Sequence, residues 1–119
     1  MENCALALLN VMLDIKSISK EKSTEASIKI RESAATEEEL VWFTLQDILS
    51  RIDSRKLSAF RFDVISIREK GKKFWLDGKL IYKKSKTDNS LLSVKAVTPH
   101  DLSVKKHSGI YSIHVVVDV

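Results

Sequence analysis

The stretch TEEELVWFTLQDILSRIDSRK, residues 36–56, contains the clearest helix signal in the chain. Thr36 and Glu39 have the spacing of a capping box, in which the threonine hydroxyl accepts a hydrogen bond from the backbone N–H three residues later. Acidic residues fill the first turn, where the helix dipole is positive, and basic residues follow at the other end. We therefore predict a helix over residues 37–53. Its apolar side comprises Val41, Leu45, Ile48, Leu49 and Ile52.

The residues before this helix predict a second helix and a strand. Apolar side chains between residues 5 and 15 form a broad arc with helical spacing, which indicates a mostly buried helix. Residues 16–25 are polar and indicate a solvated connection or a frayed helix end. The alternation over residues 27–31 predicts a short strand at a sheet edge, where Lys29 and Arg31 would discourage pairing with other chains.

After Leu57 the apolar residues alternate, which predicts strands. Over residues 59–69 two phenylalanines and Val64 share one face while Ile65 and Ile67 point the other way, so we expect a bulge or a sheet covered on both faces. Asp77-Gly78 favours a two-residue hairpin turn, because both residue types tolerate the positive φ angles that such a turn needs. The remaining expectations are strands over 72–76, 79–84, 91–98 and 110–119, the last an interior strand, and a loop over 99–109.

This order of elements predicts an α+β fold. Two helices would pack on a mainly antiparallel sheet of about five strands, with a meander in the C-terminal half. At 119 residues the chain has room for one hydrophobic core, so we predict a single domain over residues 1–119. The expected core includes Val41, Leu45, Ile48, Phe62, Val94, Ile113 and Val115.

Charge divides unevenly along the chain. Residues 1–50 hold nine acids and five bases, a net of −4, whereas residues 51–119 hold fifteen bases and seven acids, a net of +8. Opposed surfaces of this kind steer charged partners, although the charges of the two halves can equally be spread around the fold. A single cysteine, Cys4, allows no internal disulfide, and the apolar stretch near the start is too short to cross a bilayer. We expect a cytoplasmic protein without a membrane segment.

The sequence offers one catalytic pattern. Asp63 followed by Asp77-Gly78-Lys79 has the acid and acid-x-lysine spacing that a metal-dependent nuclease requires, but Asp77-Gly78 is already explained by a hairpin turn. His100, His107 and His114 lack a further ligand type that would complete a metal site. We therefore predict no catalytic residue, no metal and no cofactor, and favour a protein that is not an enzyme.

The leading hypothesis is a small protein-binding domain, with an inhibitor of the immunity or antitoxin kind as one form of it and a toxin domain as one partner. An exposed anchor surrounded by charge would carry the binding. The residues predicted for this face are Glu37, Glu38, Trp42 and Phe43.

The alternative is a nucleic-acid-binding module that uses a basic hairpin over residues 70–86. If Asp77-Gly78 forms the turn, aromatic rings and lysines share one face, as a surface for stacked bases and phosphates requires. The same pattern also fits a hairpin whose lysines only solvate a sheet edge. The residues predicted for this site are Lys72, Lys73, Trp75, Tyr82 and Lys84.

Overall fold

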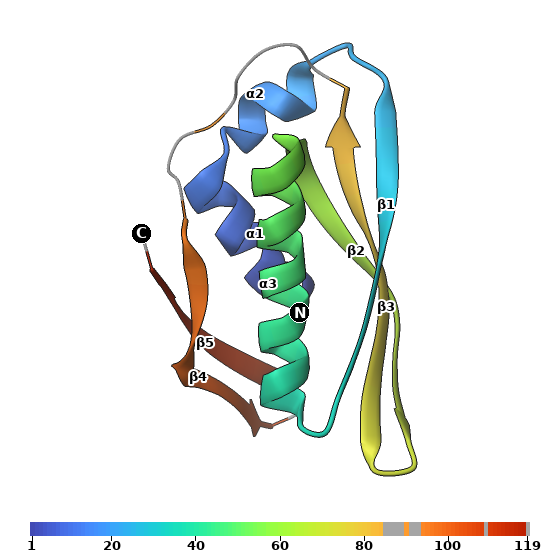
Figure 1. Cartoon of the computed structure of the whole chain (residues 1–119), viewed down its shortest axis with the longest axis vertical. Coiled ribbons are helices and arrows are strands. Elements are labelled where there is room, and N and C mark those ends of the chain that lie inside the picture. The colour runs from blue at the N-terminus through green and yellow to red at the C-terminus, as the bar shows by residue number, and fades with distance from the viewer. Residues whose placement is uncertain (85–89, 91–93, 109, 119) are drawn as a thin grey trace.

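A computed structural model of the chain describes residues 1–84, 90, 94–108 and 110–118. Within this part, three helices and five strands form an α+β fold with antiparallel sheets, which confirms the predicted class (Figure 1). The elements are α1 (Glu2–Met12), α2 (Ile15–Lys20), β1 (Glu25–Ala34), α3 (Glu37–Arg55), β2 (Ser58–Lys70), β3 (Lys73–Lys83), β4 (Ala96–His107) and β5 (Ile110–Asp118). No helix in the described part is both long and apolar enough to cross a bilayer.

Local sequence signals place the helices. The Thr36 hydroxyl accepts a hydrogen bond from the Glu39 N–H at 3.1 Å, as the capping box predicts, and Lys56 ends α3 in the left-handed conformation with φ 51°. The short helix α2 lies in the segment expected to be a connection. Asp14 caps it by accepting a hydrogen bond from Ser17 N at 3.3 Å, and Ile18 is fully buried. The cap, the buried Ile18 and the partly buried Ile15 therefore account for a helix in a mostly polar segment.

The five strands form two sheets instead of one. The larger sheet has the order β1-β3-β2, with β1 at an edge as predicted, and β4 pairs with β5 in the smaller one. Figure 1 shows α1 and α3 between the two sheets. Side chains of α3 bond the backbone of β4: Trp42 Nε1 donates to the Val97 carbonyl oxygen at 2.7 Å, and Val97 N donates to Gln46 Oε1 at 2.9 Å. These contacts hold β4 on the helix layer, away from the larger sheet.

Two predictions for the C-terminal part are wrong. The segment expected to be a loop over residues 99–109 largely belongs to β4, whose pairing with β5 shifts in register between Thr98 and Ser103. In the described residues β5 pairs with β4 alone, so it is not an interior strand. Its inward residues Ile113 and Val115 are accordingly half-buried, whereas the other five predicted core residues are buried. Part of the strand expected over 91–98 lies outside the described residues.

The predicted turn at Asp77-Gly78 is also wrong. β3 runs unbroken through both residues, and the turn between β2 and β3 lies at Gly71, which has φ 66°. Gly78 serves a different purpose, because a Cβ atom there would come within 2.6 Å of the Phe62 ring. The glycine permits close approach between neighbouring strands.

A bulge in β2 changes which side chains face outward, as the sequence allowed. Val64 pairs with Gly78 and Ser66 with Asp77, so Ile65 is an extra residue in the ladder. Beyond the bulge, Ser66 and Arg68 lie on the same face of the sheet as Asp77. The position of this bulge decides the composition of the surface described next.

Candidate nucleic-acid interface

The larger sheet has one face against the helices and one that points away from them, which we call the outer face. Along β3, Leu76, Gly78 and Leu80 are buried toward the helices, while Trp75 and Asp77 alternate to the outer face. The strand register then brings residues from far apart in the sequence together. Arg31 on β1 and Ser66 on β2 flank Asp77, and Ser33 and Arg68 flank Trp75.

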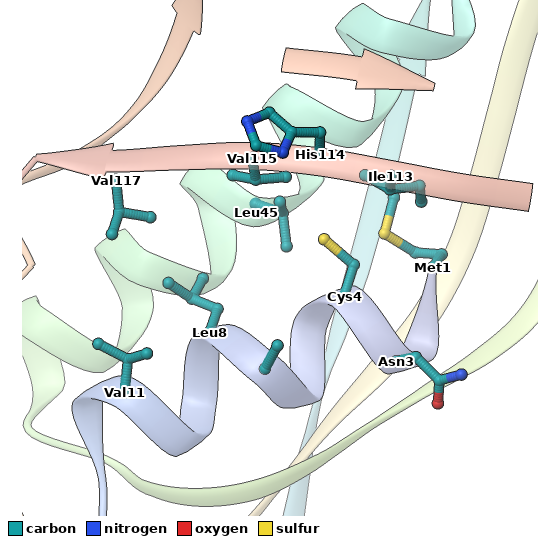
Figure 2. A pocket seen from close by; sticks show the side chains of 11 residues that line it. Met1, Asn3, Cys4, Leu8, Val11, Leu45, Ile113, His114, Val115 and Val117 are labelled. Carbon is teal, nitrogen blue, oxygen red and sulfur yellow. The ribbon is translucent and has the colours of Figure 1, made fainter. Parts of the chain in front are cut away.

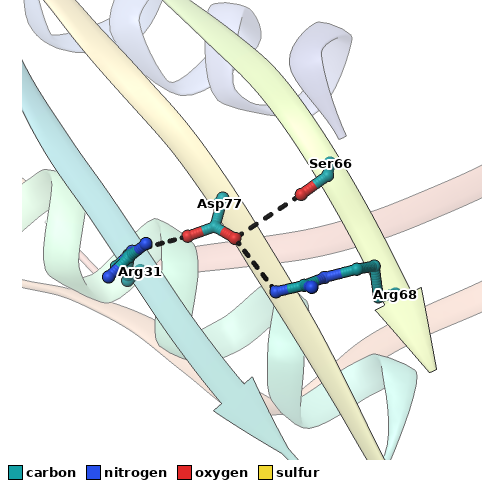
Figure 3. A network of polar contacts seen from close by, with 4 residues as sticks. All are labelled: Arg31, Ser66, Arg68 and Asp77. Carbon is teal, nitrogen blue, oxygen red and sulfur yellow. Dashed lines mark hydrogen bonds and ion pairs between the residues drawn. The ribbon is translucent and has the colours of Figure 1, made fainter. Parts of the chain in front are cut away.

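Asp77 is the centre of a polar network on this face (Figure 3). Its Oδ1 lies 2.7 Å from Arg31 Nε, and its Oδ2 lies 3.5 Å from both Arg68 Nη2 and the Ser66 hydroxyl. The Asp77 side chain is 22% exposed, whereas those of Arg31 and Arg68 are 78% and 65% exposed. The carboxylate thus accepts a hydrogen bond from Arg31 and forms a longer ion pair with Arg68, and both guanidinium groups remain open to solvent.

A hollow of about 570 Å³ adjoins this network. Its lining includes Arg31, Arg68, Asp77, Trp75 and Phe43. Trp75 is 41% exposed, which is unusual for so large an apolar side chain. Glu32 lines it as well, so the hollow combines two arginines, two carboxyl groups and aromatic surface.

The outer face as a whole is basic. Side chains that alternate outward on the three strands include eight basic and three acidic residues, a net of +5. The basic residues are Lys29, Arg31, Arg61, Arg68, Lys70, Lys73, Lys79 and Lys83, and the acidic residues are Glu25, Asp63 and Asp77. Such a surface attracts polyanions.

The nuclease interpretation does not fit this geometry. Both oxygens of Asp77 are occupied by arginine or serine partners, and Asp63 pairs with Arg61 at 2.9 Å. In the described ranges, no three His, Cys, Asp or Glu side chains are grouped so that they could hold a metal ion. The carboxylates anchor arginines and are not arranged as ligands for a catalytic cation.

The predicted hairpin site is only partly brought together. Trp75 and Lys73 lie on the outer face, Lys72 lies in the turn, and Lys84 is exposed just after β3. Tyr82 is half-buried on the opposite face, because an unbroken strand places residues seven apart on opposite sides. Residues 85 and 86 of the predicted hairpin lie outside the described residues.

Sequence reasoning missed Arg31 and Arg68 as members of this site. They lie 37 positions apart in the sequence and meet only through β3, so neither adjacency nor local spacing indicates their relationship. Two signals were present in the sequence: the outward alternation of Lys29 and Arg31 in the predicted edge strand, and the run of basic residues that begins at Arg68. Finding their partner required the register of all three strands.

The residues predicted for protein binding lie at the start of α3. Glu38 is exposed and Glu37 partly so, while Trp42 and Phe43 are half-buried with ring centroids 5.1 Å apart. Trp42 uses its indole N–H to hold β4, which gives it a structural role. Phe43 lines the hollow beside Trp75 and so belongs to the edge of the outer face.

A second hollow, of about 490 Å³, separates α1 from β5 (Figure 2). Figure 2 shows the Cys4 thiol pointing into it, with Leu8 and Val115 among the apolar side chains around it. Burial raises the pKa of the Cys4 thiol, so the thiol stays protonated and weakly nucleophilic. This hollow has the character of an incompletely filled core.

Known proteins resemble this chain in sequence and in fold. The model of the Archease protein family (MTH1598/TM1083) matches residues 1–119. The solution structure of Methanobacterium thermoautotrophicum protein 1598 superposes with a TM-score of 0.80 at 24% sequence identity, covering 98% of this chain and 81% of that one. At this identity the likeness shows a shared fold. A search of curated proteins found no match.

Proposed function

Because this chain belongs to the Archease family over its whole length, we propose that it acts in RNA processing as the accessory protein of an RNA ligase. The family match over residues 1–119 is the single observation that carries this proposal. The basic outer face supports it, since a protein that works beside a ligase operates close to RNA phosphates.

Family membership corrects the leading sequence-based hypothesis. Archeases are cofactors of RNA processing and are not immunity or antitoxin proteins, so the predicted inhibitor of a toxin is wrong. The broader expectation of a protein partner agrees with the family. We propose that this partner is the ligase, and that the protein works in the cytoplasm.

A ligation assay tests the proposed function. The purified RNA ligase of the same organism would be incubated with cleaved RNA. The number of turnovers per ligase molecule would be measured at increasing concentrations of this chain. We expect the chain to raise the turnover number until it saturates the ligase.

The control is the variant Ile48→Asp, which places a charge at a fully buried position of α3 and should prevent folding. It should give no stimulation. A turnover number that is the same with and without the folded chain, at every ratio tested, would contradict the proposed function.

A further inference from the structure

Resting on the proposed role in RNA processing, we infer that the outer face binds a single-stranded segment of RNA, with one base on Trp75 and phosphates on Arg31 and Arg68. Three features of this face point to RNA: the arginine pair beside Asp77, the exposed aromatic ring next to it, and the positive sign of the surrounding charge.

The arginine pair is held ready for phosphate. Arg31 contacts Asp77 through Nε, and Arg68 contacts the same carboxylate through one terminal nitrogen. A guanidinium group carries five N–H donors, so the other donors of both arginines can bind a phosphate. Arg31 is on β1 and Arg68 is on β2, and the axes of these two strands are separated by about 10 Å because β3 lies between them. Because Asp77 orients both groups, less side-chain entropy is lost when an anion binds.

Trp75 offers a surface for a base. It lies two residues from Asp77 on the same face of β3, flanked in register by Ser33 and Arg68, and it is 41% exposed. The adjoining hollow of about 570 Å³ falls within the range of small-ligand sites. Single-stranded RNA is commonly recognised by aromatic rings and arginine planes on which unpaired bases stack.

The charge favours RNA over a protein as the occupant. The outward residues of the sheet have a net charge of +5, which complements a phosphate backbone. A protein interface needs an apolar centre. Among the residues that alternate outward on the three strands, Trp75 is the one exposed large apolar side chain, and the bulge residue Ile65 on β2 is exposed as well. One ring suffices to stack a base, whereas one tryptophan and one isoleucine are a small centre for a protein contact.

The test measures binding of fluorescein-labelled oligouridylate of about 12 nucleotides by anisotropy over a series of salt concentrations, with an RNA duplex of the same length for comparison. Trp75→Ala should weaken single-strand binding about tenfold or more and leave the salt dependence unchanged. Trp75→Phe should restore part of the affinity, because a ring remains for stacking.

A second variant removes the arginines that would meet phosphate. Arg31→Gln and Arg68→Gln are combined with Asp77→Asn, so that no unpaired carboxylate remains on the face. The slope of log affinity against log salt should become shallower by about 0.7 for each phosphate that the protein no longer neutralises. The matched control is Arg55→Gln at the exposed end of α3, which lowers the net charge by one, as the triple variant does, and should bind RNA like the unaltered chain.

Three results would overturn the inference. The first is that the single strand does not bind at low salt. The second is that the Arg55→Gln control weakens RNA binding as much as the triple variant does. The third is that variants of this face bind RNA as the unaltered chain does but no longer stimulate the ligase. The last would identify the face as a protein contact. RNA binding is measured without ligase, so a lack of ligase stimulation by the unaltered chain would count against the proposed function alone.

Discussion

The ring of Phe62 on β2 lies so close to Gly78 on β3 that a Cβ atom at Gly78 would come within 2.6 Å of Phe62 Cζ and 3.0 Å of the Asp63 carbonyl oxygen. Phe62 is 2% exposed, so its ring has little room to move. Glycine ordinarily weakens the middle of a strand. Here its lack of a side chain allows the ring to cover the strand and complete the core.

We expect Gly78→Ala to lower the free energy of unfolding by about 1–3 kcal/mol, the usual cost of overpacking. Urea unfolding followed by circular dichroism measures the change. Adding Phe62→Leu should relieve the crowding, so the double variant should lose less stability than the sum of the two single losses. Strictly additive losses would show that the ring and the glycine do not interact.

This contact also explains why the hairpin turn predicted at residues 77 and 78 is wrong. Asp-Gly is a local turn signal, and two non-local partners override it. Phe62 fills the space above Gly78, and Arg31 and Arg68 neutralise an aspartate that would otherwise disfavour a strand. By contrast, α3 was predictable because Thr36 and Glu39 act within one turn.

The same distinction holds for the sheets and for the candidate site. The strands were largely predictable from alternation, but their division into two sheets, with Trp42 and Gln46 bonding the backbone of Val97 on the smaller one, has no local signal. In the candidate site, Trp75 and Lys73 were indicated by the local composition, whereas Arg31 and Arg68 join them only through the strand register. Interactions between residues far apart in the chain carry the information that the sequence pattern lacks.

The cap of α3 gives a second prediction. Thr36→Ala removes the oxygen that accepts from Glu39 N, and we expect a loss of about 1 kcal/mol in unfolding free energy. Thr36→Ser keeps the oxygen and should retain most of the stability. Equal losses for alanine and serine would assign the effect to the threonine methyl group instead of the cap.

The bond from Trp42 to β4 gives a third prediction. Trp42→Phe keeps an aromatic ring but removes the donor to the carbonyl oxygen of Val97, a residue only 2% exposed. Leaving that acceptor unpaired should cost about 1–3 kcal/mol. Hydrogen exchange should quicken most in β4 and β5, because Trp42 holds this sheet to α3. Uniform acceleration over all strands would argue against a local role.

A half-buried carboxyl pair links the larger sheet to α3. Glu32 on β1 hydrogen-bonds to Asp47, which forms an ion pair with Arg51 at 2.9 Å. Burial, the hydrogen bond and the charge of Asp47 raise the pKa of Glu32 from 4.5 to about 7, against the opposing effect of Arg51. Below about pH 7 the protonated form of Glu32 is therefore favoured in the folded chain.

This raised pKa predicts how stability depends on pH. Between pH 4.5 and about 7 the folded chain retains a proton on Glu32 that the unfolded chain has released, so stability falls as the pH rises and levels off above this window. The loss should be about 1 kcal/mol, because solvent screens a site that is only partly buried. Glu32→Gln mimics the protonated form and should flatten this part of the curve, as measured by urea unfolding at several pH values. Glu38→Gln removes an exposed carboxylate from α3 and should leave the slope unchanged. If both variants kept the slope of the unaltered chain, the pH dependence would have to come from a group other than Glu32.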